Sequence, residues 1–93
     1  MYAITFDLDD AALEAAYHGA SPDNGYSEIG HALEKHGFKK QQGSVYFGDE
    51  NVTAVSCVLA VQDVARTYSW FSKVVKDIRM LRIEDDTDLR VAF

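Results

Sequence analysis

Cysteines and long hydrophobic runs are what this 93-residue chain most clearly lacks. Its single cysteine, Cys57, cannot form an intrachain disulfide, which excludes the disulfide-stapled class of secreted proteins. No apolar run approaches the roughly 20 residues that a membrane-spanning helix needs. The acidic residue Asp7 interrupts the N-terminal apolar residues too early for them to form the hydrophobic segment of a signal peptide. We therefore expect a cytoplasmic protein with no membrane partner.

Positive charge is scarce as well. Lysine and arginine number 9 against 15 aspartates and glutamates, so the net charge is −6. Proteins that bind nucleic acids usually draw affinity from Lys and Arg side chains that neutralise phosphates. Composition alone therefore favours a protein partner or a small ligand, and any contact with RNA or DNA must be local, weak or built on the groove of a dimer.

The length of the chain allows one domain, residues 1–93, and excludes two. The sequence is 47% hydrophobic and 26% charged, as expected for a soluble globular domain. A domain of this size buries only about 60 to 65% of the surface of its unfolded chain. Additional apolar burial against a second copy is therefore an expected source of stability.

Apolar periodicity, capping residues and turn residues divide the chain into short strands and helices. In chain order they predict a strand at 2–8, a short helical turn within 9–17, a helix that starts near Ser21 or Asp23 and stops at Gly37, an extended region at 38–48, helices at 52–67 and 68–75, an interior strand at 78–83 and a strand at 89–93. A loop is expected from His18 onward. Gly43 divides the extended region, which is either one bent strand or a hairpin.

The predicted helix at 52–67 has a broad apolar face. This face consists of Val52, Val55, Val58, Leu59, Val61, Val64 and Ala65, and it is expected to point at the core. Cys57 lies among these residues. It is expected to be a small buried hydrophobic residue rather than a nucleophile, because no basic group lies beside it in the sequence.

The order β-α-β(β)-α-β-β predicts an α+β fold, a ferredoxin-like sandwich in which two main helices cover one face of an antiparallel sheet. An extra strand follows at the C-terminus. The second face of such a sheet has no helix, so Ala3, Thr5 and either Tyr46 or Phe47 would need another protomer to cover them. The final strand could cross to pair with that protomer. We therefore expect a homodimer.

Asp7 is the first candidate for a functional residue. A carboxylate near the C-terminal end of an apolar strand sits on a rigid element and is costly to bury without a purpose. In a dimer packed sheet to sheet, the Asp7 carboxylates of the two protomers could face each other and share a proton or hold a divalent cation. The alternative is an ordinary strand-end acid in solvent.

Two further groups could carry chemistry. Ser44 could bind a phosphate oxygen, and Tyr46 could stack on a base or act as a general acid. Arg79 is a candidate phosphate partner, and Asp77 is a candidate second acid. The alternatives are ordinary strand residues in the first group and a surface ion pair in the second. The sequence contains no Gly-x-Ser-x-Gly elbow and no Walker loop. This excludes hydrolases with a serine catalytic triad and nucleotide triphosphatases as function classes.

Three blocks of sequence lie in a distinctive order. They are Met-Tyr-Ala-Ile-Thr-Phe-Asp-Leu at 1–8, Gly-Phe at 37–38 with Gln-Gly-Ser-Val-Tyr at 42–46, and Trp-Phe at 70–71 with Val-Lys-Asp-Ile-Arg at 75–79 and Ile-Glu-Asp at 83–85. Together they resemble the virulence-associated protein D (VapD) family. The resemblance implies a ferredoxin-like fold related to the small nuclease subunit of the CRISPR adaptation machinery. It also implies a homodimer with endoribonuclease activity, and a toxin with a cognate antitoxin protein as partner.

Carried over by position, the candidate catalytic residues of the family correspond to Asp7, Ser44 and Asp77, with Tyr46 and Arg79 as candidate substrate-binding residues. The implied reaction is cleavage of RNA phosphodiester bonds. Asp7 would activate the nucleophile or hold Mg²⁺, and a metal-free route through the RNA 2′-hydroxyl also remains open. The competing hypotheses are a non-catalytic protein-interaction module on the same fold and, less strongly, a sensor of a small ligand.

Overall fold

The computed structural model describes residues 1–17, 19 and 21–93 and has the predicted α+β architecture. His18, where the loop was expected to begin, lies outside the described residues. In chain order the elements are β1 (Tyr2–Leu8), α1 (Asp10–Ala16), α2 (Pro22–Glu34), β2 (Phe38–Gln42), β3 (Val45–Gly48), α3 (Ala54–Thr67), α4 (Phe71–Val74), β4 (Val75–Arg82) and the 3-10 helix η1 (Leu89–Ala92). None of the helices in these ranges is long and apolar enough to cross a membrane.

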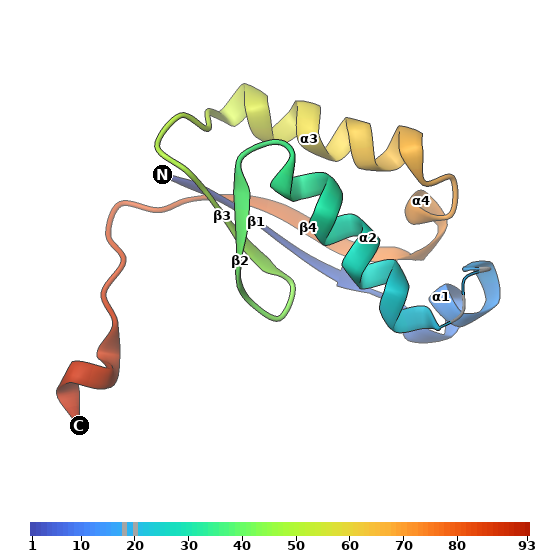
Figure 1. Ribbon diagram of the computed structural model, residues 1–93, viewed down its shortest axis with the longest axis horizontal. Helices are drawn as coiled ribbons and strands as arrows, with labels where there is room; N and C mark the ends of the chain where they lie inside the picture. Colours follow the sequence, from blue (N-terminus) through green and yellow to red (C-terminus); the bar gives the residue numbers. More distant parts are fainter. Residues whose placement is uncertain (18, 20) are drawn as a thin grey trace.

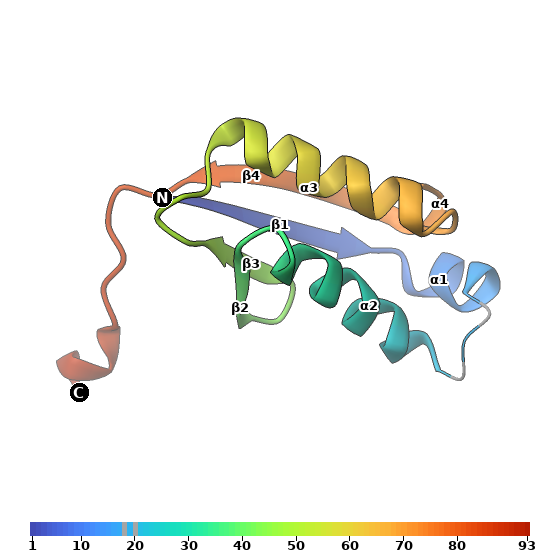
Figure 2. The same cartoon turned by 45° about the horizontal axis from the view of Figure 1, so that its top comes forward.

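Four strands form one antiparallel sheet in the order β2-β3-β1-β4. This is the strand order of a ferredoxin-like sandwich, and α2 and α3 lie side by side across one face of the sheet (Figures 1 and 2). Side chains alternate along β1. Ile4, Phe6 and Leu8 are buried in the core under the helices, whereas residues 3, 5 and 7 lie on the opposite face, which we call the open face.

Turn and capping residues set the boundaries of these elements as the sequence predicts. The Ser21 side chain caps α2 by accepting a hydrogen bond from the Asp23 amide, and Pro22 occupies the first turn. Gly37 follows the helix with a φ of 90° and Gly43 has a φ of 49°, a left-handed conformation that glycine adopts without strain. Gly43 stands in the turn between β2 and β3, so the extended region is a hairpin.

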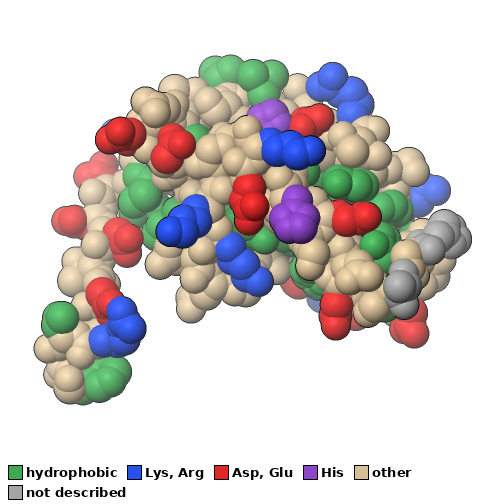
Figure 3. All heavy atoms as spheres, viewed as in Figure 1, with side chains coloured by type: hydrophobic (Ala, Val, Ile, Leu, Met, Phe, Trp, Pro, Cys, Tyr) green, Lys and Arg blue, Asp and Glu red, His purple; other side chains and the backbone are tan. Residues whose placement is uncertain are grey.

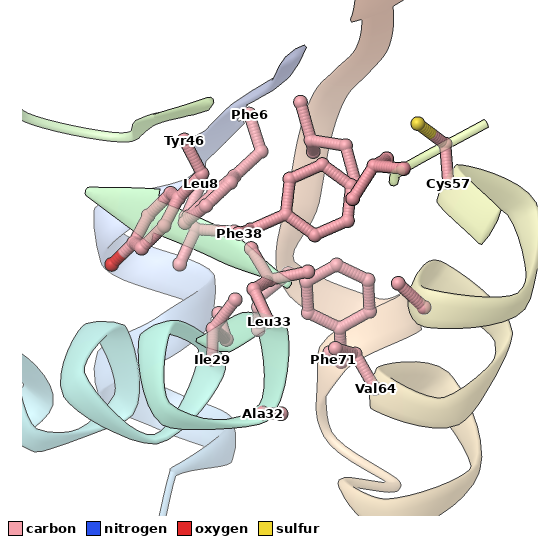
Figure 4. Close-up of a cluster of buried hydrophobic side chains, with 14 of the residues drawn as sticks. Phe6, Leu8, Ile29, Ala32, Leu33, Phe38, Tyr46, Cys57, Val64 and Phe71 are labelled. Carbon is pink, nitrogen blue, oxygen red and sulfur yellow. The ribbon is translucent and has the colours of Figure 1, made fainter. Parts of the chain in front are cut away.

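A single apolar core fills the space between the sheet and the two long helices (Figure 4). Cys57 is buried in this core, as predicted. The predicted apolar face at 52–67 is confirmed in part, because Val52 and Val64 are buried but Val55, Val58 and Leu59 are exposed. A capping box at Thr53 starts α3, and Cys57, Ala60 and Val64 are its buried residues. A patch of hydrophobic atoms lies over the N-terminal half of α3 (Figure 3).

The C-terminal third departs from the sequence prediction in three places. The short helix is confined to Phe71–Val74 and begins after Trp70, so the strand that follows starts earlier, at Val75. That strand, β4, is an edge strand of this sheet rather than an interior one. The predicted strand at 89–93 is absent, and a 3-10 helix stands there. An extended segment forms a strand only beside a hydrogen-bonding neighbour, and this segment projects away from the body (Figures 1 and 2).

A side-chain hydrogen bond links the two long helices. The imidazole Nε2 of His36, just after α2, lies 2.8 Å from a carboxylate oxygen of Asp63 on α3. Thr67 Oγ1 donates a second hydrogen bond to Asp63 at 3.3 Å. The hydrogen bond from His36 is the main cause that holds the pKa of Asp63 below its usual value.

We expect Asp63→Asn to lower the stability at neutral pH and to make no difference in strong acid. A carboxyl whose pKa is lower in the folded state stabilises the fold above its unfolded pKa, and this contribution disappears as the pH falls through the folded pKa. Urea denaturation of the wild type and Asp63→Asn at pH 7, 5 and 3 measures the difference. A difference that stays constant or grows toward pH 3 would contradict this origin of the effect.

Candidate active site

Two carboxylates face each other across adjacent strands on the open face. Asp7 on β1 is the register partner of Asp77 on β4, and both side chains are exposed. Directly opposite side chains in an antiparallel pair have Cβ atoms about 4.5 to 5.5 Å apart. Like charges at this distance repel each other, so the pair is set by the register of the strands and is not a stabilising contact. The two acids that the sequence singled out are therefore brought together.

Arg79 completes this group. Its Nε donates to both carboxylate oxygens of Asp77, at 3.2 and 3.1 Å. Arg79 is the register partner of Thr5 and stands two residues from Asp77, which places all of these side chains on the open face. The side chain of Arg79 is 70% exposed. Asp77 therefore orients a guanidinium group that remains accessible to a phosphate.

The regular ladder is interrupted beside Asp7. Asp7 pairs with Asp77 but Leu8 pairs with Val75, so Lys76 is an extra residue on β4. Such a bulge twists the strand and redirects the neighbouring side chains, and bulges are frequent next to active sites. The sequence gives no clear sign of this bulge, because Val75-Lys76-Asp77 contains no glycine.

Ser44 and Tyr46 lie on the other side of the sheet. Tyr46 faces the helices, while Val45 and Phe47 take the open face, which decides the alternative that the sequence left open. Burial, reinforced by the charge of Glu34, raises the pKa of the Tyr46 phenol. Tyr46 therefore stays protonated at neutral pH, but it is not brought to Asp7.

Ser44 stands in the hairpin turn, near the end of the sheet that carries Asp7. Its carbonyl oxygen accepts a hydrogen bond from the Phe6 amide at 3.2 Å. Ser44 and Tyr46 line a cleft of about 560 Å³ between α2 and the β2–β3 hairpin. The predicted residues thus form two groups, with Asp7, Asp77 and Arg79 on the open face and Ser44 and Tyr46 in this cleft.

Sequence reasoning missed the residues that α2 contributes to the cleft. Tyr26 and His31 line it from the helix, and Lys40 lines it from β2. Tyr26 was visible as a member of an apolar helical stripe, a pattern that indicates a core position. The exposure of Tyr26 depends on where the hairpin lies, and the sequence pattern of α2 does not predict that position.

The open face offers oxygen ligands to a hard cation. Within the ranges described, no group of three or more histidine, cysteine, aspartate or glutamate residues is placed to hold a metal ion. Asp7 and Asp77 together provide two carboxylates. Mg²⁺ is commonly bound by one or two carboxylates together with waters and substrate phosphates. The residues present therefore suit Mg²⁺ and do not form a closed structural metal site.

Fold and site together define a small ferredoxin-like α+β protein that carries an acidic pair and an arginine on an open sheet face. No family model matches the chain. It is 49% identical over 89 residues to Endoribonuclease VapD 2 of Riemerella anatipestifer, covering 96% of this chain and 95% of the relative. It is 50% identical over 92 residues to Endoribonuclease VapD homolog of Helicobacter pylori (99% and 95%) and 42% identical over 89 residues to Endoribonuclease VapD of Dichelobacter nodosus (95% and 91%). The chain belongs to the VapD family of endoribonucleases.

The close approach of Tyr46 to α2 requires glycine at position 30. A Cβ atom at Gly30 would collide with the Tyr46 hydroxyl group, and the next atom of the ring would lie at 3.2 Å. We expect Gly30→Ala to cost about 1 to 3 kcal/mol, as other overpacked sites do. In a Tyr46→Phe background the cost should fall, because alanine is otherwise favoured over glycine in a helix by about 0.5 to 1 kcal/mol. Urea denaturation of the four proteins of this double-mutant cycle measures the coupling, and equal costs in both backgrounds would contradict it.

Proposed function

We propose that this protein cleaves RNA phosphodiester bonds as a homodimer and acts as the toxin of a toxin–antitoxin pair. The observation that carries the cleavage proposal is the alignment of Asp7, Asp77 and Arg79 on the open face. Membership of the VapD family supports the same activity, since its named members are endoribonucleases. The toxin role and the antitoxin partner follow from the family resemblance.

In this proposal Asp7 is the general base. Its exposed carboxylate would take a proton from the attacking oxygen, which is either the RNA 2′-hydroxyl or a water molecule. Arg79 would bind the phosphate and stabilise the negative charge that develops on its oxygens. Asp77 would hold the guanidinium group in place through its two hydrogen bonds. Ser44 would bind a phosphate oxygen of the substrate from the hairpin turn, at the edge of this site.

Mg²⁺ is the proposed cofactor. In the route that uses the ion, Asp7 would hold it instead of acting as the general base, with Asp77 beside it, and the ion would supply positive charge next to the scissile phosphate. The ion would also offset the repulsion between the two facing carboxylates. The donor set supports this choice, because both residues offer hard oxygen ligands on the same face of the sheet.

Three features support a homodimer. β4 is an edge strand with large apolar side chains, Met80 and Leu81, exposed on both faces. The C-terminal segment projects from the body with Leu89, Val91 and Phe93 exposed by 71%, 86% and 98%. The open face has no helix over it (Figure 2). A second copy that receives the C-terminal segment and packs over the apolar end of the open face, around Phe47 and Leu81, would bury these side chains and leave the Asp7 end free for RNA.

An interaction module is the second candidate function, and one observation favours it. Val55, Val58 and Leu59 are exposed on neighbouring turns of α3, and a hydrophobic patch lies over the first part of this helix (Figure 3). Apolar side chains that gather on a surface mark sites of protein association. This surface suits an antitoxin as well as a partner of a non-catalytic module, so loss or survival of RNA cleavage decides between the two functions.

We expect Asp7→Asn to lower the rate of RNA cleavage by at least about 100-fold, because the amide cannot act as a base. Fold and dimer should persist, since the two side chains are nearly isosteric. Cleavage of a labelled single-stranded RNA at low salt, with Mg²⁺ and with chelator, measures the loss. Glu50→Gln is the matched control, because it removes one exposed negative charge from the loop between β3 and α3. Unchanged cleavage by Asp7→Asn would remove Asp7 from the mechanism.

Removal of residues 89–93 should weaken the dimer. Burial of three large apolar side chains contributes several kcal/mol to association, so the dissociation constant should rise by at least about 100-fold. Analytical ultracentrifugation over a range of concentrations measures the change. Arg90→Gln alters the same segment without removing an apolar side chain and should leave the dimer intact. A truncated chain that sediments as tightly as the wild type would refute the crossover.

A further inference from the structure

The cleft between α2 and the β2–β3 hairpin has one aromatic wall. The rings of Tyr26 and Tyr46 lie on either side of Phe6, with centroid distances of 6.3 and 6.1 Å. The interplanar angles are 22° and 16°, so the three rings are nearly parallel. Phe6 and Tyr46 belong to the core (Figure 4), whereas Tyr26 is only partly buried. A flat aromatic ligand that enters the cleft would therefore meet the Tyr26 ring first.

The Tyr26 ring is held in a fixed orientation. Its hydroxyl group donates a hydrogen bond to Asp10 at 3.3 Å. Burial is the main cause that raises the pKa of this phenol, and the charges of Asp10, Asp7 and Asp23 add to it. A fixed, neutral ring is suited to stacking because little side-chain entropy is lost when a ligand binds.

The polar part of the cleft is rich in hydrogen-bond acceptors. Asp23 and Glu34 line it from α2, and Ser44 lines it from the hairpin. The cations among its lining residues are limited to Lys40 and, when protonated, His31. Two carboxylates repel a phosphate but accept hydrogen bonds from amino groups. The lining therefore suits a neutral ring that carries an amino group better than it suits the RNA backbone.

The cleft and the acidic pair lie on opposite faces at the same end of the sheet. β1 continues to Leu8 beyond the hairpin turn, where the Phe6 amide bonds to Ser44. Phe6 points into the cleft and the next residue, Asp7, points to the open face. A nucleotide whose phosphate lies at Arg79 could therefore place a neighbouring base around the hairpin turn and into the cleft.

We propose that this cleft is a nucleobase subsite, which binds an unpaired, amino-bearing base of the RNA next to the scissile phosphate. The inference rests on the proposed function for the identity of the ligand. The volume of the cleft, about 560 Å³, lies within the range of about 300 to 1,000 Å³ that is typical of small-molecule sites. A base can enter only when it is released from a helical stack, so the subsite selects single-stranded RNA.

Direct binding of mononucleotides tests the subsite without any need for catalysis. Cytidine and uridine 5′-monophosphates differ at position 4, which is an amino group in the first and an oxo group in the second. Titration of the ¹⁵N-labelled full-length protein should shift the amide signals of Ser27, Gly30 and Gly43, more tightly with the cytidine nucleotide. Ribose 5-phosphate should leave these signals in place. Equal binding of the two nucleotides, shifts outside the cleft or equal shifts with ribose 5-phosphate would overturn the proposal.

A substitution at the mouth of the cleft provides the matched control. Ser27 is exposed on α2 at the rim, so Ser27→Trp should fill the entrance and abolish the shifts at Gly30 and Gly43. Ser72→Trp adds the same side chain at an exposed serine of α4, outside the lining of the cleft, and should change nothing. Unaltered nucleotide binding by Ser27→Trp would show that the ligand lies elsewhere.

Cleavage kinetics test the role of Tyr26 in positioning the substrate. Loss of the stacking ring in Tyr26→Leu should raise KM for single-stranded RNA by about 10-fold and leave kcat within about twofold. Tyr26→Phe retains the ring but loses the hydrogen bond to Asp10, so its KM should rise by less than that of Tyr26→Leu. Thermal unfolding confirms that both variants are folded. A Tyr26→Leu protein with unchanged KM and no loss of nucleotide binding would overturn the subsite, while loss of activity in Asp7→Asn would still support the proposed function.

Discussion

The ladder between β1 and β4 is the constraint on which the rest of the structure depends. It fixes which residues of β1 are buried under the helices and which reach the open face. A slip by one residue would carry Phe6 out of the core and Asp7 into it. Burial of Ile4, Phe6 and Leu8 therefore holds the register, and the register holds Asp7 opposite Asp77. The acidic pair, which is unfavourable by itself, is kept in place by apolar packing on the other side of the same strand.

The same ladder leaves a sheet that is incomplete at one edge. Among the described residues β4 pairs with β1 alone, although Met80 and Leu81 give it apolar side chains on both faces. The sequence pattern is that of an interior strand, whereas its position in the single chain is that of an edge. The C-terminal segment shows a similar mismatch, since it alternates like a strand but has no neighbour to pair with. Both mismatches disappear in the proposed dimer, which would provide a neighbour for each.

Sequence alone predicts the parts of the fold that depend on local chemistry. The first strand, the capping of α2 by Ser21 and the turn at Gly43 follow from side-chain alternation, capping and backbone conformation. The predictions that failed concern packing between elements. The inward face of α3 depends on how the helix packs on the sheet, and its apolar residues are spread over too much of its circumference for the sequence to choose that face. The face of Tyr46 was left open, since neighbouring strand residues point in opposite directions.

The candidate site was predicted as a set of residues but not as an arrangement. Asp7 and Asp77 lie 70 positions apart in the sequence, and only the antiparallel register places them opposite each other. The bulge at Lys76 changes the direction of the side chains at this end of β4, and no glycine or other turn-forming residue in the sequence indicates it. Prediction of the cleft also requires the relative position of α2 and the hairpin, because these two elements form it together. A pattern within one element cannot predict a space between two elements.

The net charge of −6 limits how such a protein can bind RNA. Affinity that comes mainly from phosphate contacts needs many cations on one surface, but Lys39 and Lys40 are neighbours that point to opposite faces of the sheet. Contacts with a base avoid the repulsion between phosphates and an acidic surface, because a neutral ring can stack on an aromatic side chain beside carboxylates. On the proposed subsite, a single guanidinium group positions the phosphate and the cleft supplies the remaining affinity. An acidic surface then discourages binding to intact helical nucleic acid, whose bases are not available to the cleft.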